Sequence, residues 1–314
     1  MTKISIIGGG GQVGAATGLR LIDLELVDEV VLHDVVEGIP QGKGLDMYES
    51  EPVIGKDVRV RGTQKFEDLA GSDIVVVTAG LPRKPGMSRL DLLAANIAIN
   101  KNASNAIKQH APDSIVIYVA NPVDLMTYVC WKITGFPTSR IVGMAGILDT
   151  SRFRTFVAME TGFSVQDIQA LVMGGHGDSM VPLTRFSTIS GIPVAEFIPK
   201  DRLAAIVERT KKGGGEIVEL LKTGSAFYAP GAAIAQMCES IIKNKRRLLP
   251  CCSYLNGEYG FTGFFFGAPT ILGKKGVEKV IELPLNDEEK AMLKKSAEEL
   301  KTQVQEIEDK KMYA

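Results

Sequence analysis

A histidine set between glycines, His176 in the segment 174–179, has the surroundings that best suit acid–base chemistry in this chain. The glycines allow close backbone approach and leave the imidazole accessible. A neutral imidazole can take the proton of a secondary alcohol near pH 7, because its ordinary pKa is about 6.5. A lone histidine is more often structural, so this prediction depends on neighbours that orient it.

Asp149 and Arg152 are candidates for those neighbours, because a helix would place residues three apart on one face. A carboxylate beside His176 would fix its tautomer and favour the imidazolium that forms in alcohol oxidation. The guanidinium could hold a substrate carboxylate through two hydrogen bonds. The alternative is a surface ion pair worth at most about 0.5 kcal/mol, and the spacing alone fits that alternative better.

Two further segments follow apolar runs that are typical of strands. The loop after residues 74–78 holds Arg83, Lys84 and Arg89 and could be a lid that carries cations onto an anionic substrate, or a solvated basic loop. Asn121, after the run 115–119, could hydrogen-bond both the substrate oxygen and a cofactor, or belong to an ordinary turn that ends the strand.

The first apolar run ends in four consecutive glycines. They satisfy G-x-G-x-x-G through Gly9, Gly11 and Gly14, and a form one residue longer through Gly8, Gly11 and Gly14. Such glycines permit a tight turn, approach of backbone N–H groups to a pyrophosphate, and close packing of the next helix. A flexible loop is the alternative when the motif is taken alone. The expected cofactor contacts are Gly8, Gly9, Gly10, Gly11, Gln12, Val13 and Gly14.

An acidic residue, Asp34, lies 20 residues beyond Gly14, at the end of the second apolar run. This is the spacing of a carboxylate that accepts hydrogen bonds from a ribose and repels the 2′-phosphate of NADP. The following segment 35–37 contains no arginine, so NAD is preferred over NADP. The alternative for Asp34 is a helix or turn cap.

These residues need a scaffold, and the first half of the chain predicts a doubly wound parallel sheet of the Rossmann type. Short β-branched runs alternate with helical patterns such as 13–25 and 90–109. Several runs are almost wholly apolar, as strands buried on both faces should be. The predicted strands cover residues 4–7, 30–33, 58–60, 74–78, 115–119 and 141–143.

The second half predicts an α+β substrate or catalytic domain packed on the first, since no linker composition separates them. We divide the chain into a dinucleotide-binding domain, 1–145, and this catalytic domain, 146–314. A β-rich region with strands at 254–262 and 263–266 lies among the helices. The predicted helices are 149–161, 201–222, 227–243 and 286–311.

Bulk properties exclude several classes of protein. The 36 basic and 37 acidic residues give a formal net charge of −1, which is no footprint for nucleic acid or an anionic membrane. No apolar run is long enough to span a bilayer, and no secretory signal is evident, so we expect a cytoplasmic protein. The four cysteines have no metal-ligand spacing with histidine and are interpreted as reduced thiols, so no metal is expected.

At these residues the sequence resembles the lactate/malate dehydrogenase family, and specifically its lactate-dehydrogenase-like malate dehydrogenases. The resemblance covers essentially the whole chain, and it is the joint order of the segments that makes it specific. Its one departure is a glycine loop one residue longer than the short form. The matching segments are 8–14, Asp34, 78–80 with the arginine loop, 120–122, 148–154, 175–179, 224–226 and 271–273.

The resemblance implies a role for each site residue. His176 is similar to the general acid/base and Asp149 to its carboxylate partner. Arg152 resembles the residue that binds the C1 carboxylate, and Arg89 the loop arginine that polarises the carbonyl. Contacts to the NAD cofactor are implied for Asn96 and for Val119, Ala120 and Asn121, the last of which also touches the substrate.

Arg83 matches the specificity position of the family, where arginine goes with malate and glutamine with lactate. Closing the loop over pyruvate would strand an unpaired arginine in a water-poor pocket, at a cost of several kcal/mol. Ala226, where lactate-type sequences have threonine, also favours malate. The expected reaction is hydride transfer between (S)-malate and oxaloacetate with His176 as base, and a lactate-type 2-hydroxyacid dehydrogenase is the alternative.

The resemblance also implies an enzyme of the tricarboxylic acid cycle that assembles as a homodimer or homotetramer. Two hypotheses from other classes remain. A non-catalytic NAD-binding regulator would require His176, Asp149, Arg152 and Arg89 to be coincidental survivors. A purely structural module would leave the glycine loop and Asp34 unexplained.

Overall fold

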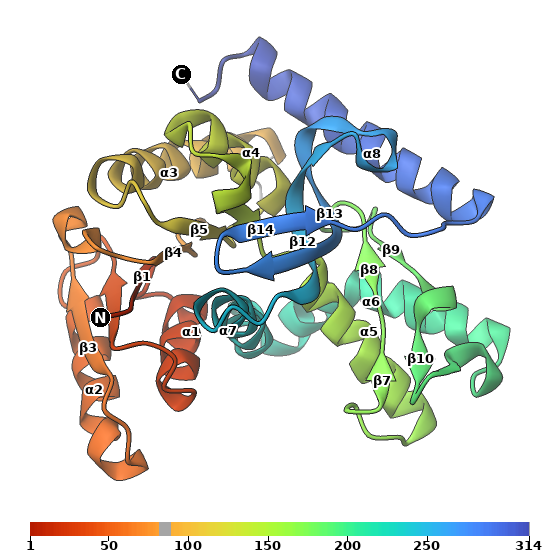
Figure 1. Ribbon diagram of the computed structural model, residues 1–314, viewed down its shortest axis with the longest axis horizontal. Coiled ribbons are helices and arrows are strands. Elements are labelled where there is room, and N and C mark those ends of the chain that lie inside the picture. The colour runs from red at the N-terminus through yellow and green to blue at the C-terminus, as the bar shows by residue number, and fades with distance from the viewer. Residues whose placement is uncertain (82–88, 314) are drawn as a thin grey trace.

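A single mixed β-sheet forms the centre of the computed structural model, which describes residues 1–81 and 89–313, without the side chains of residues 89 and 90. Within that part of the chain the sheet has nine strands, in the order β3-β2-β1-β4-β5-β6-β12-β13-β14 (Figure 1). The first six are parallel, and their order, 3-2-1-4-5-6, is that of the Rossmann fold. The predicted fold class is therefore confirmed.

The parallel strands form where the sequence places its apolar runs. β1, β2, β4, β5 and β6 are buried along their whole length, because helices cover both faces of the sheet. β3 is partly exposed at the edge of the sheet and extends beyond the predicted run 58–60. The strands are β1 (Lys3–Ile7), β2 (Glu29–His33), β3 (Arg59–Thr63), β4 (Ile74–Val77), β5 (Ile115–Tyr118) and β6 (Ile141–Gly143).

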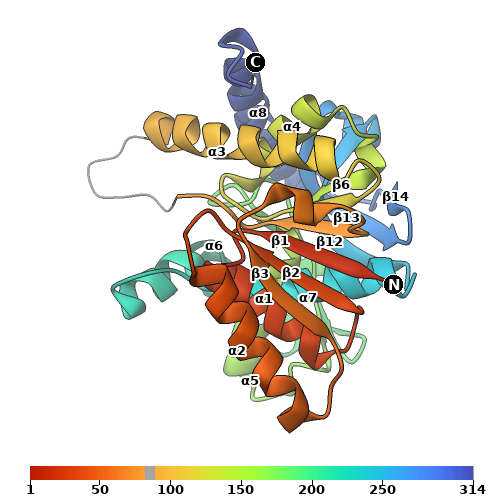
Figure 2. The same cartoon turned by 90° about the vertical axis from the view of Figure 1, so that its left-hand side faces the viewer.

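Two helical layers enclose this sheet (Figure 2). α3 (Arg89–His110), α4 (Val123–Thr134) and α8 (Asp287–Asp309) lie on one face and share one apolar core with the strands. The other face is covered by α1 (Gln12–Asp23) and α7 (Tyr228–Ile242), which contribute to a second core. α2 (Ile39–Ile54) lies beside β3 at the edge of the sheet.

The second half of the chain extends the sheet and adds a smaller layer. Cys252 of β12 (Arg247–Asn256) pairs with Gly143 of β6, so the sheet continues past the predicted boundary at residue 145. β13 (Thr262–Gly273) and β14 (Gly276–Val280) complete it in antiparallel order. The predicted strand 254–262 is wrong in its extent. Tyr259 has φ 54°, and the 3₁₀ turn Glu258–Gly260 separates β12 from β13.

A third apolar core lies between α5 (Gly146–Thr161) and α6 (Lys200–Leu221) and beneath several short strands. This layer carries the segment with His176 against the sheet, because Gly174 N–H donates to the carbonyl of Gly267 in β13. The short strands are β7 (Ile168–Gln169), β8 (Val172–Met173), β9 (Val181–Pro182), β10 (Thr188–Ile189) and β11 (Ile192–Pro193), and the remaining 3₁₀ turns are Phe66–Leu69, Thr138–Arg140, Thr184–Phe186 and Val194–Glu196.

No helix in residues 1–81 and 89–313 combines the length and the apolar character needed to cross a membrane.

Candidate active site

The glycine loop joins β1 to α1 and has almost no room for side chains. The N–H groups of Gly8 and Gly9 both donate to the carbonyl of His33, at 2.9 and 2.8 Å. Gly8 has φ +88°, and a Cβ there would lie 2.6 Å from the backbone nitrogen of Ala79. A Cβ on Gly14 would lie 2.4 Å from the carbonyl oxygen of Gly8. The loop therefore has room for backbone atoms only at these positions, which allows phosphate groups to approach its N–H groups closely.

Helix α1 starts directly after this loop with its amino end open. Gly11 is the residue that precedes the helix, and no side chain caps the first turn, which also contains no acidic residue. Both Gly11 and Gln12 are exposed. Free N–H groups and the positive end of the helix dipole favour an anion at this point.

Asp34 follows β2 and lies beside the loop. Its Oδ2 accepts a hydrogen bond from Gly10 N–H at 3.0 Å, and its Oδ1 accepts one from Val36 N–H at 3.3 Å. The carboxylate is half-buried. It therefore caps the turn, as the alternative prediction had it, and it also stands at the end of β2 next to Gly10, where a ribose-binding acid would stand.

His176, Asp149 and Arg152 come together although the histidine is 27 residues from the aspartate in sequence. His176 Nδ1 lies 2.7 Å from Asp149 Oδ2, and Arg152 Nη1 donates to Asp149 Oδ1 at 3.1 Å. The side chains are only 13%, 2% and 14% exposed for His176, Asp149 and Arg152. The alternative of a surface ion pair, which the spacing alone favoured, is therefore wrong, because Asp149 is buried between Arg152 and His176.

This arrangement controls the proton affinity of His176. Burial would lower the pKa of the imidazole, since a buried charge loses its hydration. The charge of Asp149 and its hydrogen bond act in the opposite direction and prevail, so the pKa of His176 is raised above its ordinary value. Because Nδ1 faces the carboxylate, Nε2 is the ring nitrogen left for a substrate proton.

A second buried carboxylate, Asp124 on α4, supports the same histidine and was given no role by the sequence analysis. Its Oδ2 accepts a hydrogen bond from the backbone N–H of His176 at 2.8 Å. Burial raises the pKa of Asp124. Gly175 N–H donates to Ser296 Oγ of α8 at 2.9 Å. The backbone that carries His176 is thus held by two helices. The only signal in the sequence was an acidic residue three positions beyond Asn121.

The side chain of Asn96 on α3 contacts the segments that follow β4 and β5. The buried Asn96 amide donates to the carbonyls of Asn121 and Leu81, at 2.8 and 3.2 Å, and its Oδ1 accepts from Leu81 N–H. Val119 and Ala120 are buried, whereas Asn121 is exposed. Asn96 therefore ties the strand ends together within the protein, and the exposed side chain of Asn121 is the one open to a ligand.

Two predicted residues cannot be placed against this cluster. Arg83 lies outside the described residues, and Arg89 is described only as the first residue of α3, without its side chain. The other predicted residues follow β1, β2, β4, β5 and β6 or lie on the segment after β8. The five parallel strands among these all end at the same edge of the sheet. In residues 1–81 and 89–313 no group of His, Cys, Asp and Glu is arranged to hold a metal ion.

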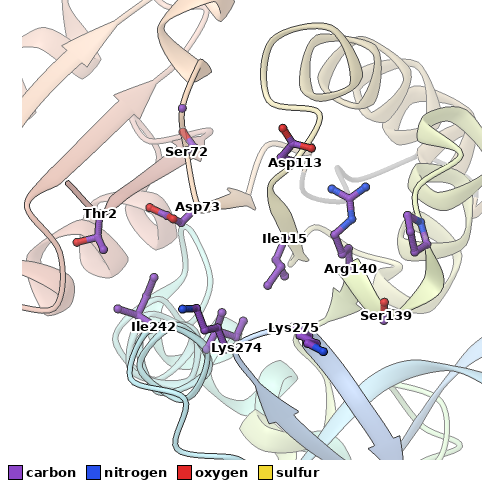
Figure 3. A pocket seen from close by; sticks show the side chains of 13 residues that line it. Thr2, Ser72, Asp73, Asp113, Ile115, Ser139, Arg140, Ile242, Lys274 and Lys275 are labelled. Carbon is purple, nitrogen blue, oxygen red and sulfur yellow. The ribbon is translucent and has the colours of Figure 1, made fainter.

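A cavity of about 670 Å³ lies at the opposite edge, where the parallel strands begin (Figure 3). Its walls carry Arg140, Lys274 and Lys275 together with Asp73 and Asp113, so charges of both signs face it. Ligands of doubly wound sheets bind at the carboxyl ends of the strands. The cavity is therefore separate from the candidate active site.

The chain is similar to known proteins along nearly its whole length. Residues 2–143 match the model of the lactate/malate dehydrogenase NAD-binding domain, and residues 147–311 match that of the α/β C-terminal domain. A malate dehydrogenase of Roseiflexus sp. strain RS-1 is 58% identical over 302 residues, covering 96% of this chain and 97% of the relative. The matched NAD-binding domain confirms NAD as the predicted cofactor.

Solved structures show the same likeness. The malate dehydrogenase of Picrophilus torridus has a TM-score of 0.95 at 45% identity, with 98% of both chains covered. The lactate dehydrogenase of Cryptosporidium parvum complexed with lactic acid and nicotinamide adenine dinucleotide has a TM-score of 0.94 at 39% identity, again with 98% of both chains covered. Fold similarity thus does not separate the two activities, but the chain belongs to the lactate/malate dehydrogenase family.

Proposed function

We propose that this protein is a malate dehydrogenase that interconverts (S)-malate and oxaloacetate with NAD. The observation that carries the proposal is the cluster of His176 and Arg152 around the buried Asp149, in which a base, its carboxylate and a carboxylate-binding cation are contiguous. Relatives 52–58% identical over 95% or more of the chain are named malate dehydrogenase.

His176 is the general base. With Nδ1 held by Asp149, its Nε2 takes the hydroxyl proton of malate as the C2 hydrogen departs with its electron pair. The imidazolium that results lies 2.7 Å from the Asp149 carboxylate, which stabilises the new charge without accepting the proton. In the reverse direction the same imidazolium protonates the carbonyl oxygen of oxaloacetate.

Arg152 binds the C1 carboxylate of the substrate. One of its nitrogens donates to Asp149, which fixes the side chain and leaves the other donors of the guanidinium for a ligand. A planar fork of donors matches a carboxylate in two parallel hydrogen bonds. The substrate is thereby oriented with its C2 hydroxyl toward His176.

The residues of the glycine loop fit a dinucleotide. A Cβ at Gly8 or Gly14 would meet backbone, and the open end of α1 favours the pyrophosphate. Asp34 would accept hydrogen bonds from the adenosine ribose. When bound, NAD supplies the hydride acceptor at C4 of its nicotinamide. The residues proposed to contact it are Gly8, Gly9, Gly10, Gly11, Gln12, Val13, Gly14, Asp34, Asn96, Val119, Ala120 and Asn121.

The loop that contains Arg83 and Arg89 completes the site. Arg83 pairs with the distal carboxylate of malate, and Arg89 polarises the C2 oxygen when the loop closes and excludes water. This pairing decides the substrate, because pyruvate has a methyl group where oxaloacetate has its second carboxylate. A lactate-type dehydrogenase is the second candidate, since solved lactate dehydrogenases share the fold at 39–40% identity.

Several coarser features belong to the same proposal. The boundary between the NAD-binding and catalytic domains falls at residues 145/146, and the enzyme is cytoplasmic and acts in the tricarboxylic acid cycle. Assembly into a homodimer or homotetramer is supported by α2, where Leu45 and Tyr48 expose large apolar side chains three positions apart, on one face of the helix.

An assay of NADH oxidation with oxaloacetate and with pyruvate tests the function. We expect kcat/KM to favour oxaloacetate by at least about a thousandfold, because pyruvate leaves a buried cation unpaired. Replacing Arg83 by glutamine should move the preference toward pyruvate, while Lys84→Gln, which removes a neighbouring charge of the same loop, should not. Equal rates with the two substrates in the unmodified protein would overturn the role of Arg83 and favour the lactate-type alternative.

A further inference from the structure

Helix α6 contains three consecutive glycines, Gly213, Gly214 and Gly215, in its interior. Glycine weakens a helix relative to alanine, because it has more backbone freedom to lose. None of the three has a positive φ, and all lie within the regular helix. Their backbone conformation therefore gives no reason for glycine, and the reason has to be sought in what surrounds them.

The side chain of Arg152 occupies the space beside two of these glycines. A Cβ on Gly213 would lie 3.1 Å from Arg152 Cδ and 3.5 Å from Nε. A Cβ on Gly214 would lie 3.4 Å from Nη2 and 3.8 Å from Nη1. A Cβ on Gly215 would meet no atom within 4 Å. Burial follows the same order, since Gly213 is buried, Gly214 half-buried and Gly215 exposed.

Arg152 is also held by a residue of its own helix, α5. Its Nη1 donates to Asp149 at 3.1 Å, and its Nε is buried without a hydrogen-bond partner among the described residues. The guanidinium is therefore confined between the carboxylate on its own helix and the glycine surface of α6. A side chain added on that surface would displace the guanidinium toward Asp149 or tilt it. It could also block access to the guanidinium N–H donors that do not bind Asp149.

We propose that Gly213 and Gly214 are positioning residues that seat Arg152 and thereby set the affinity for the substrate's carboxylate, while Gly215 has no part in this. The inference rests on the proposed role of Arg152. It also accounts for the position of the glycines in α6, because the two glycines at which a Cβ would have least room are the two that lie beside Arg152.

Valine substitution at each position tests the proposal. G213V, G214V and G215V make the same chemical change on one helix, so G215V is the matched control for altered helix propensity. We expect G213V and G214V to raise KM for oxaloacetate about tenfold or more, because displacement of a positioning group by a fraction of an ångström weakens a bidentate contact. The KM of G215V should stay within about twofold of that of the unmodified protein. The Kd of NADH, measured by NADH fluorescence, should stay within about twofold in all three variants.

An unchanged KM in both G213V and G214V, or an equal rise in G215V, would overturn the proposal. If a valine variant does not fold, the alanine pair G213A and G215A decides. The methyl group added in G213A would still press on Arg152 Cδ, so G213A should raise KM more than G215A does, and equal KM values for these two would also overturn it.

The Arg152→Lys variant separates this inference from the role on which it rests. Lysine keeps the charge but lacks the planar fork, so KM for oxaloacetate should rise in R152K as well. If KM for oxaloacetate rises in R152K but not in the glycine variants, only the positioning role of Gly213 and Gly214 is rejected. An unchanged KM in R152K would instead reject the carboxylate-binding role of Arg152 in the proposed function.

Discussion

Two histidines with little solvent exposure lie near the carboxyl edge of the same sheet and have opposite properties. His33 is the last residue of β2, is 1% exposed, and stacks on Phe66 with ring centroids 4.1 Å apart. Neither of its ring nitrogens has a hydrogen-bond partner among the described residues. The side chain of His176 is 13% exposed, and its Nδ1 lies 2.7 Å from Asp149 Oδ2. Burial lowers the pKa of His33, whereas the partnered His176 has a raised pKa.

The difference shows what turns a buried imidazole into a base. Burial by itself keeps the ring neutral, which suits the apolar contact of His33 with Phe66. A carboxylate that is itself buried restores the affinity for a proton and also fixes the tautomer. His33 still serves the cofactor loop, but through its backbone carbonyl, which accepts from Gly8 and Gly9, and not through its ring.

The largest expected effect comes from replacing each histidine in turn. His176→Asn should lower kcat by about 10⁴-fold, the upper end of what a positioned general base contributes, with the Kd of NADH unchanged. His33→Phe is the matched control, because it replaces a stacked ring by another apolar ring and breaks no hydrogen bond among the described residues. Its kcat should stay within about threefold of the unmodified enzyme. Comparable losses in both variants would show that the two histidines do not differ as described.

Removing the carboxylate should make His176 resemble His33. Asp149→Asn removes the negative charge that raises the pKa of His176, so the effect of burial dominates and the pKa falls. For malate oxidation the base has to be neutral, so the acid limb of the kcat/KM profile should move to lower pH. The same variant should lose about 10²-fold or more in kcat, because the imidazolium is no longer stabilised. An acid limb that keeps its midpoint would mean that a group other than His176 is titrating.

The signals for His176 could be read in part from the sequence, whereas the sequence predicts no role for His33 beyond its place in a strand. The glycines around His176 and the i,i+3 spacing of Asp149 and Arg152 are local signals, and helix geometry translates the second into a shared face. The apolar runs likewise predicted all six parallel strands to within a few residues. The sequence could not decide whether Asp149 is a partner of His176 or part of a surface ion pair with Arg152, because the burial of Asp149 depends on the packing of distant elements.

Other features leave no local signal. Helix α2 contains Pro40 and Pro52 besides glycines, so its periodicity is poor, and the helix forms against β3. The contact of Asp124 with His176 N–H joins residues 52 apart. The surface that Gly213 and Gly214 offer to Arg152 requires α5 and α6 to be packed together. Each of these depends on tertiary contacts that no spacing in the sequence encodes.

The smallest expected effect concerns stability as a function of pH, and it separates the two histidines without an activity assay. His33 has a folded-state pKa below its unfolded value of about 6.5, so the unfolded chain binds the proton first as the pH falls. Stability attributable to His33 is therefore complete above about pH 6.5 and is lost below it, by up to about 1.4 kcal/mol per pH unit.

For His176 the sign is reversed: its raised pKa gives stability that is complete below about pH 6.5 and is lost as the pH rises through the folded-state pKa. Urea unfolding of the unmodified protein, H33F and H176N between pH 5.5 and 8 measures both contributions. H33F should lose less stability than the unmodified protein below about pH 6.5, because it no longer has a buried ring that resists protonation. H176N should show its deficit most strongly on that same acid side, since the ion pair with Asp149 is then missing. Parallel curves for the three proteins would mean that neither ring changes its proton affinity on folding, and the contrast between the two sites would then have no electrostatic basis.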